Sequence, residues 1–169
     1  MVRSELAGDG TLSRMLDAQI DAGWPCEYWD RAAMEWTINA IDEGPMADGW
    51  GMWYWVLRPP HNPERVLIGN GGFKGPPGQD GTIEIGYSIV PEQRRHGLAT
   101  EACRELIAWA WRDSRVKIIA AETFPHLQPS IGVMKKLRMT LRGEGSEPGT
   151  IRYAISRAEL ASVSESPAR

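Results

Sequence analysis

A short run from Arg94 to Thr100 combines two arginines, one glycine and small side chains between two differently patterned segments. The residues before it alternate in polarity like a strand, and those after it place apolar side chains at helical spacing. A helix that begins directly after a strand leaves its first N–H groups unpaired and carries about half a positive charge there. Gly97 and Ala99 leave room for a phosphate, and Arg94 and Arg95 add charge at the rim. The run therefore predicts a phosphate or pyrophosphate site.

A simpler interpretation of these residues is a turn glycine followed by solvated arginines. The order strand, turn, helix favours the anion site, because that is the backbone context such sites need. The two commonest nucleotide loops do not fit. The kinase-type loop requires Gly-Lys-Ser/Thr, which is absent, and the dinucleotide fingerprint requires a first glycine where Gln93 or Arg94 stands.

The elements that position this turn can be read from periodicity and turn residues. Helical faces are expected from Leu12 to Ile20 and from Asp30 to Gly44, and the opening of the chain is therefore helical. Further along, we expect strands over 50–57, 65–73 and 82–90, a helix over 99–110, a strand over 117–123, a helix over 130–137, and a hairpin pairing 141–142 with 150–156. A strand, helix, strand crossover therefore surrounds the basic turn.

Composition limits the classes of partner and compartment. The chain has 169 residues, 42% of them hydrophobic, which suits one domain (1–161) followed by a disordered tail (162–169). A net charge of -3 argues against nucleic acid or an anionic membrane as partner. No apolar run is long enough to span a bilayer, and no secretory core is present, which favours a cytoplasmic protein. Neither Cys26 and Cys103 nor the three histidines have metal-ligand spacing, so no metal is expected.

Arg94-Arg95-His96-Gly97-Leu98-Ala99 matches the acetyl-CoA motif Q/R-x-x-G-x-G/A, and the chain resembles the GCN5-related N-acetyltransferases. The continuation "ATEA" resembles the branch that contains the ribosomal-protein alanine acetyltransferases. The resemblance extends from Leu67 through "EIGYSIVPEQRRHGLATEA" to "AAETFPHLQPSIGVMKKL", about half of the chain. It implies an α/β (α+β) fold with a mixed, mostly antiparallel sheet flanked by helices. It also implies a splayed strand pair at the cofactor site.

The resemblance also implies where acetyl-CoA binds. Its pantetheine arm is expected to pair with backbone groups of the strand before the turn, and its pyrophosphate with amides of the turn. The implied cofactor-binding residues are Ile89, Val90, Arg94, Arg95, His96, Gly97, Leu98, Ala99 and Thr100.

Acetyl transfer requires a neutral amine, so a base is helpful for an α-amine and close to obligatory for a lysine. The resemblance places the catalytic carboxylate at Glu84. Glu84 lies on the strand that leads into the turn, beside Gly86, which leaves room. A surface glutamate is the simpler alternative, and Glu122 and Glu147 are weaker candidates for the base.

The resemblance places Ser130 beside the CoA sulfur, although a serine at a helix start can serve only as a cap. Two departures from the family stand near it. Leu127 replaces an asparagine that usually bonds the pantetheine or the local backbone, a role that Gln128 or His126 could take over. Leu137-Arg138-Met139 replaces Leu-Gly-Phe, at a cost of about 1 kcal/mol for a non-glycine cap.

These observations predict an acetyl-CoA-dependent N-acetyltransferase that transfers the acetyl group directly to a primary amine. Some of Trp24, Trp29, Trp50 and Trp53 could line the amine pocket, since indole rings attract cations. The alternatives are a non-catalytic acetyl-CoA-binding sensor, which Leu127 favours, and a tryptophan-rich interaction module without CoA affinity. The identity of the amine and the oligomeric state, a homodimer included, stay open.

Overall fold

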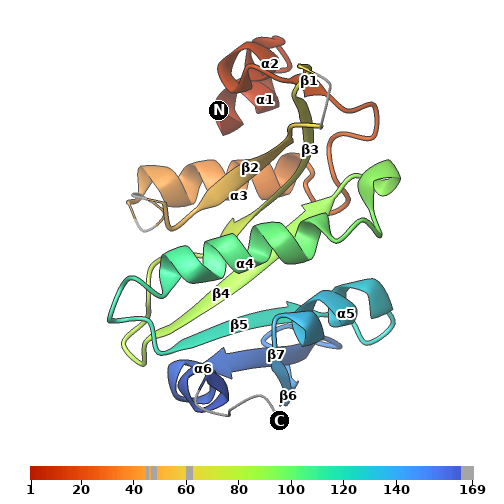
Figure 1. Ribbon diagram of the computed structural model, residues 1–169. Helices are drawn as coiled ribbons and strands as arrows, with labels where there is room; N and C mark the ends of the chain where they lie inside the picture. The colour runs from red at the N-terminus through yellow and green to blue at the C-terminus, as the bar shows by residue number, and fades with distance from the viewer. Residues whose placement is uncertain (45, 47–48, 60–62, 165–169) are drawn as a thin grey trace. The chain divides into compact units, whose positions relative to one another are not determined.

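The computed structural model describes residues 1–44, 46, 49–59 and 63–164, which form helices and strands (Figure 1). The helices are α1 (Val2–Ala7), α2 (Thr11–Leu16), α3 (Arg31–Asp42), the 3-10 turn η1 (Pro91–Gln93), α4 (Leu98–Ala110), α5 (Gln128–Lys136) and α6 (Arg157–Ser164). The strands are β1 (Gln19–Ile20), β2 (Met52–Leu57), β3 (Val66–Phe73), β4 (Thr82–Ile89), β5 (Ile118–Thr123), β6 (Thr140–Glu144) and β7 (Ile151–Ser156).

The strands form a mixed seven-stranded sheet in the order β1-β3-β4-β5-β7-β6, with β2 paired to β3. The pairs β1–β3 and β4–β5 are parallel, whereas β2–β3, β5–β7 and β6–β7 are antiparallel. The expected mixed α/β fold is thereby confirmed. The chain divides into two compact units, residues 1–73 with 87–99 and residues 74–86 with 100–169, called here the first and the second unit.

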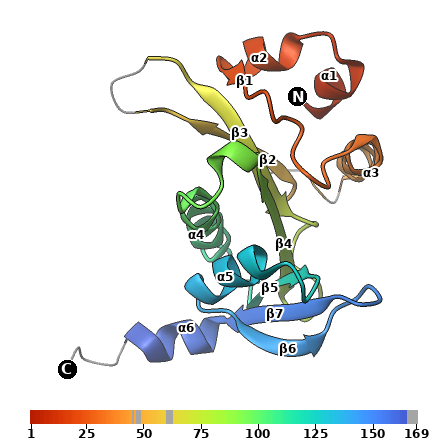
Figure 2. The ribbon, with the colours of Figure 1, turned by 90° about the vertical axis from the view of Figure 1, so that its right-hand side faces the viewer.

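In the first unit, α1 and α3 lie on the same side of β2 and β3 (Figure 2). Val2 of α1, Ile38 of α3, Ile68 of β3 and Val90 belong to one buried cluster. The expected start of α3 is confirmed, because the Asp30 carboxylate accepts a hydrogen bond of 2.9 Å from the Ala33 N–H. This core holds the strand end that leads into the basic turn.

The expected helix from Leu12 to Ile20 is wrong in its second half. Asp17 takes a left-handed conformation with φ 48° and ends α2 after Leu16. Ile20 then pairs in parallel with Leu67 as part of β1. Strand pairing therefore overrides the apolar spacing of these residues, and α1 is a helix that the sequence reading did not identify.

In the second unit, α5 and the Thr100–Ala110 part of α4 lie on the same side of β5 (Figure 2). Cys103 and Leu106 of α4 and Met134 of α5 are buried, as are Ile83 and Ile119 of the sheet. The β4–β5 register runs from Thr82–Ile118 to Glu84–Ala120 and ends there, although both strands continue. The splayed strand pair at the cofactor site stays a prediction.

At the C-terminus, α6 continues to Ser164, so the first three residues of the expected disordered tail are helical. Residues 165–169 lie outside the described residues. Among the described helices, none combines the length and the apolar character that a bilayer crossing requires.

Candidate functional site

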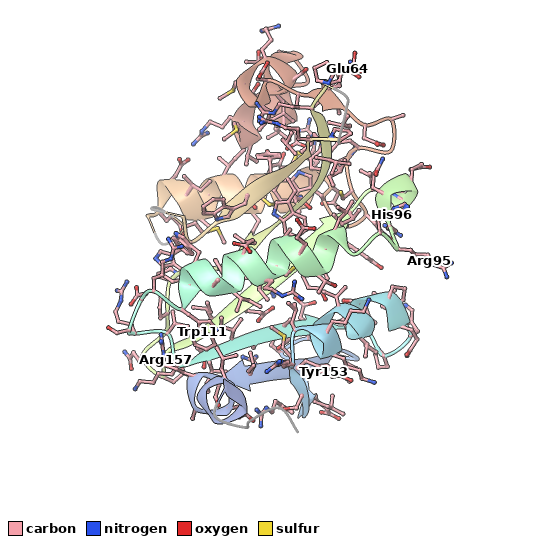
Figure 3. All side chains as sticks on the ribbon, in the orientation of Figure 1. Glu64, Arg95, His96, Trp111, Tyr153 and Arg157 are labelled. Carbon is pink, nitrogen blue, oxygen red and sulfur yellow. The ribbon has the colours of Figure 1, made fainter. Side chains whose placement is uncertain are left out.

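The basic turn lies in the first unit and has an unusual backbone. Arg95 and Gly97 have positive φ angles of 68° and 83°, whereas His96 between them does not. Such alternation is typical of turns whose successive N–H groups form an anion-binding concavity. A Cβ built on Gly97 would meet nothing within 4 Å, and residues 94–97 are exposed. Figure 3 shows the Arg95 side chain extending away from the ribbon beside His96.

Arg94 is held by the protein rather than extended into solvent. Its Nε donates to the Ile89 carbonyl at 2.9 Å, and its Nη2 lies 3.2 Å from Glu27 Oε2. A guanidinium has five N–H donors, so donors remain after these two contacts. Arg94 therefore has a fixed orientation at the start of the turn, which is more than the rim charge that the sequence suggested.

The strand end before the turn is also partly engaged. The Val90 N–H donates to the Ile68 carbonyl at 2.9 Å, and the Val90 carbonyl accepts from the Gln93 N–H at 3.1 Å. The Ile89 carbonyl accepts from Arg94 and, having two lone pairs, can accept a second donor. The expected pairing with a pantetheine arm stays a prediction at these two residues.

The residues after Gly97 anchor the turn to the interior. Leu98 and Ala99 are half-buried and pack against the core of the first unit. Thr100, which begins the second unit's share of α4, is buried. The turn is thus exposed where a ligand would approach and anchored where the helix begins.

Glu84 lies in the second unit, on β4, where it pairs with Ala120 of β5. Its side chain is 18% exposed and forms an ion pair with the ammonium of Lys74. A Cβ built on Gly86 would meet nothing within 4 Å, in agreement with the room expected beside Glu84. Glu84 is therefore a partly accessible carboxylate next to open space.

Glu122, a weaker candidate for the base, is held differently. Its carboxylate accepts from the Ser146 N–H and hydroxyl at 2.8 Å each, from Thr150 Oγ1 at 3.5 Å, and from Arg152 Nη1 at 2.8 Å. Burial alone would raise the pKa of Glu122, but the bonds from Ser146 and the guanidinium of Arg152 together hold it below its ordinary value. Such a carboxylate is a structural anion. Glu147, the other candidate, is exposed.

Ser130 lies in the first turn of α5 and is half-buried. The helix begins at Gln128, and Leu127 occupies the N-cap without a side-chain hydrogen bond. Because Ser130 lies inside the helix, it is not the N-cap residue, and that alternative is wrong. Gln128 Nε2 donates to the Pro125 carbonyl at 2.8 Å, so of the two suggested replacements for the asparagine Gln128 makes a local backbone bond, and a bond to pantetheine stays a prediction.

Helix α5 ends at its C-cap Leu137, and the left-handed residue that follows is not glycine. Arg138 takes a left-handed conformation with φ 63°. The Arg138 N–H donates to the Lys135 carbonyl, and the Met139 N–H to the Met134 carbonyl at 3.0 Å. These two bonds form the Schellman motif that glycine usually completes.

The cysteines are buried and unpaired. Burial raises the pKa of Cys26 to about 11 and also raises that of Cys103, so both are thiols at neutral pH. Within the described ranges, no group of three or more His, Cys, Asp or Glu side chains is placed to hold a metal ion.

A comparison with protein families matches residues 4–140 to the acetyltransferase (GNAT) domain, which covers well over half of the chain. The chain belongs to the GNAT acetyltransferase family. The uncharacterized N-acetyltransferase YjdG of Bacillus subtilis (strain 168) is 32% identical over 93 residues, 55% of this chain and 54% of that protein. The chain thus spans about half the length of this curated relative.

Solved structures of other GNAT acetyltransferases are also similar. A GNAT-family acetyltransferase from Bacillus anthracis is 26% identical, with a TM-score of 0.50 over 56% of this chain and 61% of that one. Mycobacterium smegmatis RimJ, solved in complex with CoA-disulfide, is 17% identical, with a TM-score of 0.56 over 76% of this chain and 61% of that one. At that identity, RimJ shows the GNAT fold alone.

The sequence did not identify three residues that form ion pairs or hydrogen bonds with the candidate site residues. Lys74 meets Glu84, Glu27 meets Arg94, and Glu5 accepts hydrogen bonds from Trp24, Trp29 and Tyr54. Lys74 and Glu27 lie in turns whose composition gives no signal. Glu5 lies on α1, which the sequence reading did not identify, so no sequence signal pointed to this residue.

Proposed function

We propose that this GNAT protein is an acetyl-CoA-dependent N-acetyltransferase that transfers an acetyl group to a primary amine by direct transfer in a ternary complex. The acceptor would be a protein N-terminus or a small-molecule amine. The observation that carries the proposal is the exposed turn at residues 94–97, where Gly97 has a positive φ and open space beside its Cα, directly before α4.

This turn fits the pyrophosphate of acetyl-CoA. The first N–H groups of α4 have no partners within the helix, and the alternating φ signs at Arg95 and Gly97 suit an anion. Arg94 and Arg95 supply positive charge, and Ile89 and Val90 precede the turn. Acetyl-CoA, when bound, supplies the thioester that carries the acetyl group.

Glu84 would take the proton from the incoming amine, directly or through water. At pH 7 an α-amine with a pKa near 8 is about one-tenth neutral, whereas a lysine amine is neutral about once in 2,500 molecules. A positioned base therefore matters for either acceptor and most for a lysine. The partial exposure of Glu84 and the space beside Gly86 support this assignment.

Ser130 would donate a hydrogen bond to the departing sulfur. A thiol has an ordinary pKa near 8.5, so its thiolate is a modest base that needs a hydrogen bond rather than a strong acid. The N-cap of α5 is Leu127 and not Ser130, which supports a role for this serine other than capping.

A thiol-release assay tests the proposal directly. Acetyl-CoA is incubated with the protein and a panel of amines that contains N-terminal peptides, lysine peptides, polyamines and amino acids. We expect amine-dependent release of CoA thiol with at least one class of acceptor. Acetyl-CoA binding without thiol release for any acceptor would favour the sensor, and absence of binding would favour the interaction module.

A further inference from the structure

The segment Trp24–Trp29 of the first unit is held at both ends by one carboxylate. Glu5 Oε1 accepts from Trp24 Nε1 at 2.6 Å, and both Glu5 oxygens lie 3.1 Å from Trp29 Nε1. Glu5 Oε2 also accepts from the Tyr54 hydroxyl at 2.6 Å. A residue of α1 therefore joins both ends of this segment to β2.

These contacts identify Glu5 as a structural acceptor rather than a ligand site. A carboxylate offers about four lone-pair positions, and the two indoles and the phenol account for four donor contacts. Burial, followed by the bond to Glu5, raises the pKa of Tyr54, so its hydroxyl stays a donor at neutral pH. An amine cation at Glu5 would compete with three donors that already bind its carboxylate.

Glu27, in the middle of the same segment, accepts hydrogen bonds from Ser88 of β4 and from Arg94 of the basic turn. The Ser88 hydroxyl donates to the Glu27 carbonyl at 3.2 Å, and Arg94 Nη2 donates to the Glu27 carboxylate at 3.2 Å. Arg94 Nε is in turn fixed on the Ile89 carbonyl. Glu5 therefore contacts Trp24 and Trp29 at the two ends of the segment, the backbone between them carries Glu27, and Glu27 contacts Arg94.

We propose that Glu5 is a remote positioning residue for the acetyl-CoA turn, which acts through the Trp24–Trp29 segment and the Glu27–Arg94 pair. The inference rests on the proposed function in assigning acetyl-CoA to the turn. The Glu27–Arg94 pair alone is partly exposed, and exposed pairs contribute little unless their partners are already held in place. Glu5 supplies that hold, because it fixes the segment that carries Glu27.

The test is a double-mutant cycle with Glu5→Gln and Glu27→Gln, read as acetyl-CoA affinity by calorimetry. Glutamine keeps the shape of Glu5 but replaces one acceptor oxygen by a donor that faces the same N–H groups. Each single variant should bind acetyl-CoA roughly 3–10-fold more weakly, with the effect in KM for acetyl-CoA rather than in kcat. The double variant should be no weaker than the weaker single variant, because in this proposal Glu5 acts on the turn only through the Glu27–Arg94 pair, which Glu27→Gln has already removed.

If the factors by which the two single variants weaken acetyl-CoA binding multiply in the double variant, the proposal is overturned, since independent sites give additive free energies. Glu35→Gln is the matched control, because Glu35 is an exposed glutamate on α3 paired only locally with Arg31. It should leave acetyl-CoA affinity unchanged. If Glu5→Gln does not fold, Tyr54→Phe replaces it in the cycle, because it removes one donor to Glu5 and keeps the ring.

A second readout needs no cofactor and separates this inference from the proposed function. Tyr28 is 65% exposed within the segment, so chymotrypsin cleavage after Tyr28 reports how firmly the segment is held. Coupling is reciprocal, so Arg94→Ala should speed this cleavage, as should Glu5→Gln. An unchanged rate in Arg94→Ala would overturn the inference even if the wild-type protein binds acetyl-CoA. Absence of acetyl-CoA binding by the wild-type protein, with accelerated cleavage in Arg94→Ala, would instead overturn only the proposed function.

Discussion

Glu84 and Glu122 lie on the adjacent strands β4 and β5, yet their carboxylates differ in exposure and in the number of their hydrogen-bond and ion-pair partners. Glu122 is 6% exposed and accepts from Ser146, Thr150 and Arg152, which join it to the β6–β7 hairpin. Glu84 is 18% exposed and pairs with Lys74, whose own side chain is half exposed. The family resemblance and the position on the strand before the turn favoured Glu84 in the sequence, and the structure separates the two glutamates by their partners.

These contacts make a change of protonation less costly at Glu84 than at Glu122. A proton on Glu122 would weaken several charge-assisted hydrogen bonds at once. In a buried site, donors left without a hydrogen-bond partner lower the free energy of unfolding. A proton on Glu84 would weaken one ion pair with a lysine that water can solvate. These contacts favour our proposal of Glu84 as the base, whereas those of Glu122 support the hairpin.

The largest expected effect is that of Glu84→Gln. Loss of a general base typically lowers turnover by ~10²–10⁴-fold, because the amine must then shed its proton to water. The loss should be greatest at neutral pH and should partly recover at high pH, where the neutral fraction of the amine rises by itself. The measurement is a pH profile of turnover at saturating acetyl-CoA. A variant profile with the wild-type height and shape would remove Glu84 from the mechanism and break the comparison.

Ser130→Ala should have the next largest effect. We expect turnover to fall roughly ten- to a hundredfold, about 1.4–2.8 kcal/mol of barrier, with acetyl-CoA affinity nearly unchanged. Because Leu127 is the N-cap of α5, the melting temperature should change little. Steady-state kinetics with thermal denaturation measures both quantities. A lower melting temperature with preserved turnover would assign Ser130 to the fold.

Glu122→Gln sharpens the comparison from the other side. We expect a loss of about 1–2 kcal/mol in the free energy of unfolding at neutral pH and no change in the shape of the pH–turnover profile. Because the pKa of Glu122 is lowered in the folded protein, its contribution is fully present above the ordinary carboxyl pKa near 4.3. It is lost as the pH falls toward the lowered folded value. Urea unfolding should therefore show a difference between variant and wild type that shrinks below about pH 4; a constant difference would show that its charge is not responsible.

Arg138→Gly should have the smallest effect and touches neither carboxylate. Glycine adopts the left-handed conformation of Arg138 without a steric penalty, so the free energy of unfolding should rise by up to about 1 kcal/mol. Turnover should be unchanged. Destabilisation of the variant would mean that the arginine side chain contributes more than its backbone strain costs.

The elements with strong periodicity could be predicted from sequence, and those set by tertiary contacts could not. Asp30, a preferred N-cap residue, predicts the start of α3. The alternation of apolar and polar side chains up to the turn predicts β4. Ile20 was misassigned because its pairing partner, Leu67, lies far away in the sequence. The helix limit at Ser130 was misplaced because Pro129 is tolerated inside a first helical turn.

The candidate site divides in the same way. The run around Gly97 carries its own signal, because positive φ, small residues and a following helix are local properties. The partners that hold the site residues, such as Glu27 on Arg94 and Lys74 on Glu84, depend on side-chain contacts across the fold. Such partners leave no pattern in one sequence.

The central claim is that the turn at residues 94–97 binds acetyl-CoA, and calorimetry of Gly97→Glu tests it most directly. The substitution adds bulk and negative charge where a pyrophosphate would approach. Gly149→Glu is the matched control, because Gly149 has nearly the same φ, 81° against 83°, on an exposed turn of the β6–β7 hairpin. Both variants should lose similar stability from backbone strain, about 1 kcal/mol. The account predicts that Gly97→Glu remains folded without measurable acetyl-CoA binding and that Gly149→Glu binds like the wild type; wild-type affinity in Gly97→Glu would contradict it.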